Sequence, residues 1–195
     1  MTVQRIGVLG GTFDPVHNGH LQAALAAQRF LELDRLLFIP AGDPWQKHTV
    51  ATAAQRAEML GLAIQGHPGF ELDRTEIERS GPTYTVDTLQ SLRERFARDD
   101  LFFILGSDAL AGIGSWKESS RLFELAKFAV LERPGHAIDL SVAPTGAVLV
   151  VPEAMPETSS TECREMIAAG SLSEAPIPES VIEYIRDNQL YRSAA

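Results

Sequence analysis

The strongest pattern along the chain is a set of short apolar runs, each closed by glycine or proline. Residues 6–11 read IGVLGG, residues 36–39 read LLFI before Pro40, and residues 101–105 read LFFIL before Gly106. These runs are apolar at nearly every position, which predicts strands buried on both faces of a sheet. Weaker runs predict further strands at residues 70–77, 126–131 and 148–151.

Between these runs, apolar residues recur at helical spacing. In residues 19–33, for example, Leu21, Ala24 and Leu25 fall near one helix face. The same reasoning predicts helices at residues 53–64, 85–96, 162–168 and 179–187. Strands that alternate with helices indicate an α/β fold with a Rossmann-like open sheet, mostly parallel, with helices on both faces. We expect one domain over residues 1–195, with a C-terminal helical part at about 159–190, and a long surface loop at 134–146.

In an open sheet of this kind, ligands bind beyond the carboxyl ends of the strands. The rule directs attention to Gly10-Gly11, Pro40-Ala41, Gly106-Ser107-Asp108 and Arg133, which all follow predicted strands. These places are far apart in the sequence. If the sheet is parallel, they should gather along one rim.

Composition narrows the class of protein. The formal net charge is −9, so the phosphate backbone of a nucleic acid would be repelled and no nucleic-acid partner is expected. Cys163 is the single cysteine and cannot form an internal disulfide, which favours a reducing compartment. The start has no signal-peptide pattern and no run of about 18 apolar residues exists, so we expect a cytoplasmic protein without a membrane partner.

The segment GGTFDPVHNGHL, from Gly10 to Leu21, carries the candidate chemistry. The glycine pair after a strand lets the backbone turn sharply and approach a ligand, and N–H groups at the following helix start can hold anionic oxygens. His17 and His20 would share a helix face, with Gly19 leaving room above it for a bulky ligand. The alternatives from spacing alone are surface histidines or a metal pair, but no third ligand has recognisable zinc spacing.

This segment resembles the signature of the nucleotidyltransferase superfamily with an HxGH motif, supplied here by His17, Gly19 and His20. A second segment, residues 158–164 (TSSTECR), resembles the carboxyl-side ATP motif of that superfamily. There Ser159 or Ser160 could cap a helix whose N-terminus, with Arg164, would face phosphate. The family often has apolar residues at positions 158, 162 and 163, where this chain has Thr, Glu and Cys, which leaves the local packing open.

The chain as a whole resembles the bacterial nicotinate-nucleotide adenylyltransferases. Besides the two motifs, the resemblance rests on PTYT at 82–85 with Thr88-Leu89, ILGSD at 104–108, Trp116, RPG at 133–135, and the tail at 178–191. It implies transfer of the adenylyl group of ATP to nicotinate mononucleotide, giving nicotinate adenine dinucleotide and pyrophosphate in NAD biosynthesis. Mg²⁺ is expected to arrive on the ATP phosphates, without a metal site built from protein ligands.

The resemblance also assigns roles to residues of this chain. His17, His20 and Arg164 are the expected catalytic residues. The expected ATP-binding residues are Gly10, Gly11, Thr12, Phe13, His17, His20, Gly106, Asp108, Ser159, Thr161 and Arg164. The expected acceptor-binding residues are Lys47, Tyr84, Thr85, Asp108, Trp116 and Arg133. For Lys47, a solvated loop position is an equal alternative, and Trp116 could instead be a packing residue.

Two other functions stay open at this point. One is a transferase of the same superfamily that acts on phosphopantetheine or on the amidated nucleotide, although Trp116 and the 82–85 segment favour a pyridine acceptor. The other is a nucleotide-binding regulatory module without turnover. The oligomeric state is open as well, with a homo-oligomer among the alternatives.

Overall fold

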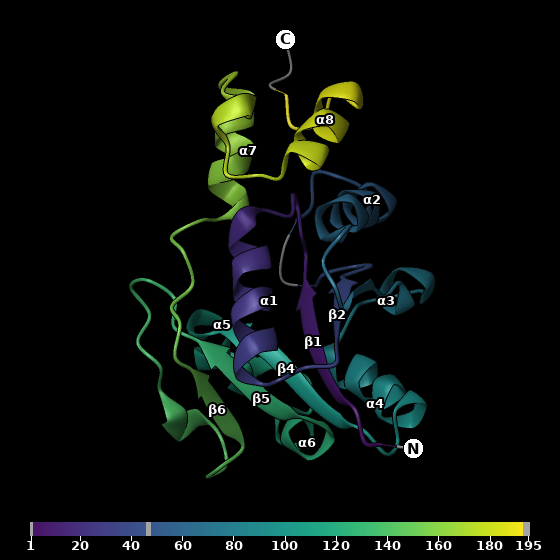
Figure 1. Cartoon of the computed structure of the whole chain (residues 1–195), viewed down its shortest axis with the longest axis vertical. Coiled ribbons are helices and arrows are strands. Elements are labelled where there is room, and N and C mark those ends of the chain that lie inside the picture. Colours follow the sequence, from purple (N-terminus) through teal and green to yellow (C-terminus); the bar gives the residue numbers. More distant parts are fainter. Residues whose placement is uncertain (1, 46–47, 193–195) are drawn as a thin grey trace.

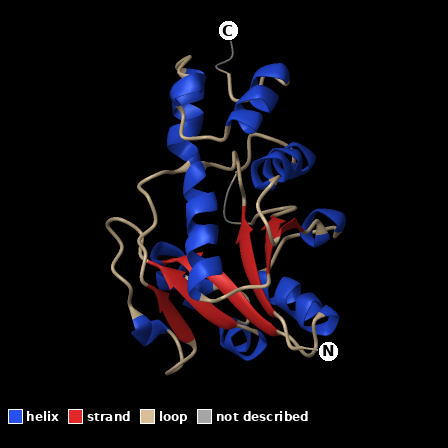
Figure 2. Ribbon diagram, in the orientation of Figure 1, coloured by secondary structure: helices blue, strands red, loops and turns tan. Residues whose placement is uncertain are grey.

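The computed structural model describes residues 2–45 and 48–192, and in this part of the chain six parallel strands form one sheet. The strand order is β3-β2-β1-β4-β5-β6, and helices cover both faces (Figures 1 and 2). The strands are β1 (Arg5–Gly11), β2 (Arg35–Pro40), β3 (Phe70–Leu72), β4 (Asp100–Gly106), β5 (Lys127–Leu131) and β6 (Val148–Val151). The order reverses between β1 and β4, which is where doubly wound sheets of this kind open a crevice for ligands.

The helices follow the strands in the alternating order expected for parallel crossovers. They are α1 (Asn18–Phe30), α2 (Ala53–Ile64), α3 (Thr75–Glu78), α4 (Thr85–Arg95), α5 (Ser107–Ala111), α6 (Ser119–Leu125), α7 (Ser160–Ala168) and α8 (Glu179–Asp187). Short 3₁₀ turns lie at Ile113–Ser115, Leu140–Val142 and Leu172–Glu174. The two last helices lie beyond the carboxyl end of β1, where α8 packs on α2 (Figure 1).

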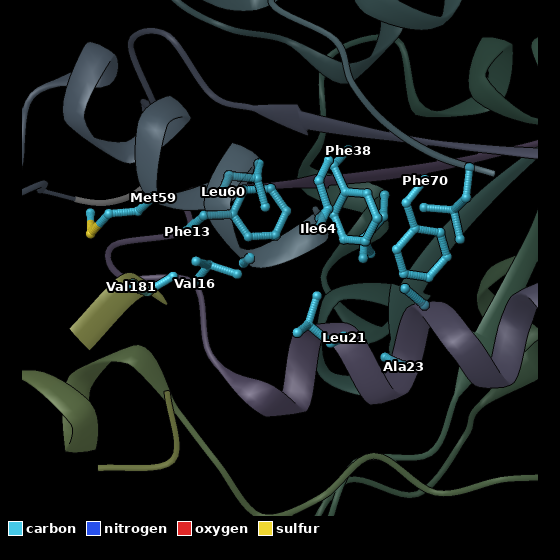
Figure 3. Packing of buried hydrophobic residues seen from close by; sticks show 14 of the residues in the cluster. Phe13, Val16, Leu21, Ala23, Phe38, Met59, Leu60, Ile64, Phe70 and Val181 are labelled. Atoms are coloured by element: carbon cyan, nitrogen blue, oxygen red, sulfur yellow. The ribbon is translucent and has the colours of Figure 1, made fainter. Parts of the chain in front are cut away.

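Each face of the sheet has its own apolar core, because successive strand residues point to opposite faces. On one face, Phe38 and Phe102 pack with α1, α2, α7 and α8. Figure 3 shows this cluster, in which Phe13 and Val16 of the β1–α1 loop lie with Val181 of α8. On the other face, residues such as Phe103 and Phe128 pack with α4, α5 and α6. The β1–α1 loop is therefore part of a core and not a free surface loop.

The predicted fold class is confirmed, and the strands of the described sheet are all parallel. One strand is present but shorter than predicted: the strand expected within 70–77 ends at Leu72, and residues 75–78 form α3. Asp73 makes the break, since its Oδ1 accepts hydrogen bonds from the Thr75 backbone N–H and hydroxyl. Two short helices, α5 and α6, were not predicted because they lack a long periodic pattern. The single domain over residues 1–195 stays a prediction.

Candidate active site

A cleft of about 300 Å³ opens at the carboxyl ends of β1 and β4, where the strand order reverses. Most of the residues expected to bind substrate line it, although they come from segments far apart in the sequence. The expected residues in the lining are Gly10, Gly11, Thr12, Phe13, His20, Tyr84, Thr85, Gly106, Asp108, Trp116 and Arg133. The residues that follow the predicted strands therefore gather at one edge of the sheet and line a concave surface there.

A larger and more open hollow of about 570 Å³ lies between β2, β3 and α4. Its arginines are engaged in ion pairs, Arg35 with Glu71 and Arg95 with Asp73. The same hollow lacks the glycine-rich strand ends that let a ligand approach the backbone. We therefore place the candidate active site in the smaller cleft.

The β1–α1 loop is held rigidly at the floor of the cleft. Phe13 has a φ of 51° and is only 1% exposed, so its ring anchors the turn in the core. Arg56 of α2 is also 1% exposed, and its guanidinium donates to the backbone carbonyl groups of Thr12 (2.7 Å) and Ala41 (2.6 Å). These bonds join the ends of β1 and β2. The loop can therefore present its groups to a ligand without first becoming ordered.

Two expectations about glycines are wrong in detail. The sharp turn is made at Phe13 and not at Gly10 or Gly11, which remain in β1. Gly11 is needed for space, since a Cβ there would lie 3.0 Å from the Phe13 ring. Gly19 does not leave an open space above the helix face either. A Cβ there would meet His17 Nδ1 at 3.0 Å and Pro156 at 3.3 Å, so Gly19 permits close packing.

The two histidines stack on one another, with ring centroids 3.7 Å apart. His20 Nδ1 accepts a hydrogen bond from the His17 backbone N–H at 3.2 Å, which places the proton of a neutral His20 ring on Nε2. His20 lines the cleft, and its Nε2 can therefore act as a donor toward an anionic oxygen.

His17 lies behind His20 and is only 4% exposed. Burial, with a smaller contribution from the nearby Arg133, lowers the pKa of His17 to about 4, although Glu162 opposes the shift. The ring is therefore neutral near pH 7 in the absence of a ligand. A polyphosphate beside this pair would favour the imidazolium forms and oppose that shift.

The second motif forms the start of α7 beside the same loop. Ser159 caps the helix: its Oγ accepts from the Glu162 backbone N–H at 3.2 Å, and the Glu162 carboxylate accepts from the Ser159 backbone N–H at 2.9 Å. Ser160, not Ser159, lines the cleft, and its hydroxyl donates to the Pro15 carbonyl. Of the positions that depart from the family pattern, Glu162 takes part in this cap and Cys163 is buried in the core.

Arg164 lies against the early loop, as the convergence of the two motifs requires. Its Nη1 donates to the Asp14 backbone carbonyl at 2.8 Å and its Nη2 to the Thr161 hydroxyl at 3.2 Å. Arg164, Thr161, Ser159 and His17 are absent from the cleft lining among the described residues, and they flank residues that line it. Their contacts with ATP stay predictions.

Asp108 and Arg133 face each other across the ends of β4 and β5. Arg133 Nη1 lies 2.9 Å from Asp108 Oδ2, and both side chains are about one third exposed. Ser107 fixes the turn behind them, since its hydroxyl donates to the His136 carbonyl and accepts from the Arg133 backbone N–H. The pair leaves Asp108 Oδ1 able to accept hydrogen bonds from a sugar hydroxyl.

The other end of the cleft is aromatic. Trp116 meets Phe103 edge-on, with ring centroids 6.2 Å apart, and also lines the cleft. Lys117 Nζ lies 4.6 Å from the centre of the Tyr84 ring, and Trp45 packs 6.1 Å from the same ring. The Lys117 ammonium is already paired with the Asp87 carboxylate at 3.1 Å, so this wall offers a flat ligand mainly aromatic surface.

Sequence reasoning missed a buried carboxyl group in this wall. Glu76 of α3 is 6% exposed and lines the cleft, and its Oε1 accepts from the Thr88 hydroxyl at 2.6 Å. Burial raises the pKa of Glu76 to about 7, while the Thr88 hydrogen bond and Arg79 oppose the rise. No sequence signal distinguished it, because the segment was expected to be a strand. Lys47 lies outside the described residues.

The comparisons with known proteins agree with this geometry. The model of the cytidylyltransferase-like family matches residues 8–166, which include both motifs and every strand from β4 to β6. The fold and site thus define a nucleotidyltransferase.

Curated relatives narrow the assignment. One from Leifsonia xyli subsp. xyli, named a "Probable nicotinate-nucleotide adenylyltransferase", is 42% identical over 98% of this chain and 96% of its own length. One of the same name from Streptomyces coelicolor is 44% identical over 94% of this chain and 99% of its own length. The chain belongs to the nicotinate-nucleotide adenylyltransferases within the cytidylyltransferase-like family.

Solved structures support the fold independently. The nicotinic acid mononucleotide adenylyltransferase of Plasmodium falciparum, solved in complex with APC, superposes with a TM-score of 0.80 at 22% identity. The alignment covers 96% of this chain and 97% of the other. The same enzyme in complex with NaAD gives a TM-score of 0.78, with the same identity and coverage.

Among the described residues, none of the helices has the length and apolar character needed to cross a membrane. The same residues contain no group of three or more His, Cys, Asp or Glu side chains arranged to hold a metal ion.

Proposed function

We propose that this chain transfers the adenylyl group of ATP to nicotinate mononucleotide and releases pyrophosphate. The observation that carries the proposal is the cleft at the strand reversal, where His20 at one end and an aromatic wall at the other are joined by Asp108 and Arg133. The relatives at 42–44% identity support the same activity by their names.

In this reaction a phosphate oxygen of the acceptor attacks the α-phosphorus of ATP. The new P–O bond forms as the bond between the α-phosphorus and the bridging oxygen breaks, and pyrophosphate leaves with the electron pair. The acceptor phosphate is already anionic near neutral pH, so no side chain has to remove a proton. Catalysis then depends on alignment and on stabilising negative charge.

The residues divide by the end of the cleft that they occupy. At the phosphate end, His20 Nε2 donates to a phosphate oxygen, His17 stacks behind it, and Arg164 holds the loop or reaches the leaving group. Gly10, Gly11, Thr12 and the start of α7 allow the triphosphate to approach the backbone. Asp108 accepts from a ribose hydroxyl while Arg133 holds it in place.

At the acceptor end, the Trp116 ring stacks on the pyridine ring, which is cationic in this nucleotide. Backbone N–H groups at Tyr84-Thr85 and Lys117 donate to the ring carboxylate, since the Trp116 N–H already donates to the Ile113 carbonyl at 3.0 Å. Lys47, outside the described residues, is proposed to contact the acceptor phosphate as a point charge.

We propose that magnesium enters this cleft as an ion carried by the substrate. The nearby carboxyl groups each have one oxygen engaged, Asp108 Oδ2 by Arg133 and Glu76 Oε1 by Thr88, and Asp108 Oδ1 is assigned to a ribose hydroxyl. We therefore propose that Mg²⁺ takes its ligands from phosphate oxygens and water, and we assign no step to a metal held by protein. We further propose that the enzyme works in the cytoplasm on small molecules, without nucleic acid or membrane partners.

A panel of acceptors tests the function. Purified protein is mixed with ATP, Mg²⁺ and one of nicotinate mononucleotide, nicotinamide mononucleotide or phosphopantetheine, and both pyrophosphate and the adenylylated product are measured. We expect product with nicotinate mononucleotide at the highest kcat/KM. Faster turnover of another acceptor would make that acceptor the substrate. ATP binding without product from any acceptor would indicate a nucleotide-binding module without catalytic activity.

A further inference from the structure

The carboxylate of Asp14, in the β1–α1 loop, joins three distant parts of the chain. The side chain is 2% exposed. Its Oδ2 accepts from the Val50 backbone N–H at 2.7 Å, and its Oδ1 accepts from the Ala51 backbone N–H at 3.1 Å. The third donor is the Tyr191 hydroxyl, 2.6 Å from Oδ1 and 177 residues away in sequence. The adenylyl transfer assigned above uses none of these groups directly.

Tyr191 is held firmly at the end of the C-terminal helical part. It is 7% exposed and has a φ of 60°, a left-handed conformation that is unfavourable for a non-glycine residue. Burial raises the pKa of Tyr191 well above its usual value, so the hydroxyl stays a donor at working pH. The helix before it, α8, packs on α2 and shares a core with Val16.

Other bonds from the same part of the chain reach the neighbouring loop residues. Arg164 donates to the Asp14 carbonyl at 2.8 Å, and Ser160 donates to the Pro15 carbonyl at 2.9 Å. The Pro176 carbonyl accepts from the Asn18 backbone N–H at 2.9 Å. The C-terminal helical part is therefore hydrogen-bonded to the β1–α1 loop on both sides of His17, whose ring stacks on His20.

We propose that Tyr191 is a positioning residue for adenylyl transfer, which holds Asp14 and through it the loop that presents His17 and His20. The inference rests on the proposed function for its kinetic consequence. The same carboxylate also fixes Val50 and Ala51, which end the loop that carries Trp45. Through Asp14, Tyr191 thus fixes the position of the β1–α1 loop, at the phosphate end of the cleft, relative to the loop that carries Trp45 at the acceptor end.

The test compares Tyr191→Phe with the wild-type protein and with Tyr184→Phe as a matched control. Tyr184 lies in α8, the helix before Tyr191, and its charged neighbour is Glu58 rather than Asp14. All rates are measured at least 20 °C below each melting midpoint and per folded molecule. We expect Tyr191→Phe to lower kcat about tenfold, with KM for each substrate changed by about twofold or less, because loop placement affects alignment more than binding.

A second readout does not depend on activity. The ring signals of His17 and His20 are followed by NMR in the ligand-free proteins. We expect Tyr191→Phe to shift or broaden them and Tyr184→Phe to leave them unchanged. Unchanged ring signals overturn the inference, whether or not the rate falls. Moved signals with an unchanged kcat overturn the kinetic role. If the wild type makes no product with any acceptor and the signals still move, the proposed function fails and the positioning role remains.

A double-mutant cycle tests the route through Asp14. If Tyr191 acts through that carboxylate, the effect of Tyr191→Phe on kcat should be much smaller in an Asp14→Asn background than in the wild type. Independent, multiplying effects would contradict the route. Should Asp14→Asn fail to fold, the histidine signals of the single Tyr191→Phe variant still decide the question.

Discussion

The two ends of the cleft are built in different ways. At the phosphate end, Phe13 and His17 are 1% and 4% exposed, and the backbone carbonyls around them accept hydrogen bonds from Arg56 and Arg164. At the acceptor end, Trp45 is 50% exposed, and Tyr84 and Trp116 are half-buried side chains held mainly by ring contacts. One end is fixed by bonds from several elements, and the other presents flat surfaces that a ligand can complete.

The difference indicates a division of labour. Charge stabilisation requires donors fixed before the reaction, because reorganising them would cost part of what they contribute. Recognition of a flat ring requires area and stacking, which aromatic side chains supply with little loss of entropy on binding. We therefore expect changes at the phosphate end to act on kcat and changes at the acceptor end to act on KM for the acceptor.

The largest effect is expected for His20→Ala. Loss of the Nε2 donor should lower kcat by about 10²-fold or more, by analogy with removal of one oxyanion donor, with little change in the melting midpoint. Steady-state kinetics and thermal unfolding measure the two quantities. His67→Ala, a histidine stacked on Phe70 outside the cleft, serves as the control. A normal kcat in His20→Ala would remove that residue from the phosphate end.

Trp116→Ala should act on the acceptor alone. Loss of stacking is worth about 1–3 kcal/mol, so KM for nicotinate mononucleotide should rise about tenfold or more while KM for ATP stays the same. Trp116→Phe keeps a smaller ring, so its KM for nicotinate mononucleotide should lie between those of the wild type and Trp116→Ala. An equal rise in both KM values would show that Trp116 supports the fold of the cleft and does not contact the pyridine ring.

Glu76 makes the acceptor end sensitive to pH. Its pKa is raised to about 7 in the folded chain, above its unfolded value of 4.5, so the folded state prefers the protonated form. The stability that Glu76 contributes is fully present below pH 4.5 and is lost as the pH rises through about 7.

Glu76→Gln should remove this loss, since the amide oxygen can still accept from Thr88. We expect the variant to be more stable than wild type at pH 8, by about 1–3 kcal/mol, with the difference shrinking toward pH 5. Denaturant unfolding at several pH values measures it. A difference that is constant between pH 5 and pH 8 would contradict the raised pKa.

His17 gives the smallest and most local signal at the phosphate end. Without ligand its ring should titrate near pH 4, because burial favours the neutral form. A depressed pKa of this kind means that stability is present above pH 6.5 and is lost as the pH falls through about 4. A nonhydrolysable ATP analogue should raise the His17 pKa by about one unit or more. NMR titration measures the His17 pKa without and with the analogue. If the analogue leaves this pKa unchanged, His17 does not lie beside the phosphates.

How far the sequence predicts this molecule depends on the range of the interactions. The apolar run of β1 and the helix at 53–64 follow from local patterns, and the structure places α2 at Ala53–Ile64. The HxGH signature identifies the phosphate loop because its parts are adjacent in sequence. The Asp14–Tyr191 bond spans 177 residues and has no local pattern. Glu76 was hidden for a related reason, since the Asp73 turn that ends β3 converts a predicted strand into α3.

The most direct test of the account is a crystal structure with nicotinate mononucleotide and an ATP analogue that cannot be cleaved at the α-phosphorus. We expect the triphosphate at the β1–β4 end of the cleft, with a phosphate oxygen within hydrogen-bond distance of His20 Nε2. We expect the pyridine ring against Trp116, with the acceptor phosphate facing the α-phosphorus. A nucleotide bound with its phosphates away from His20, or a pyridine ring outside the aromatic wall, would contradict the account.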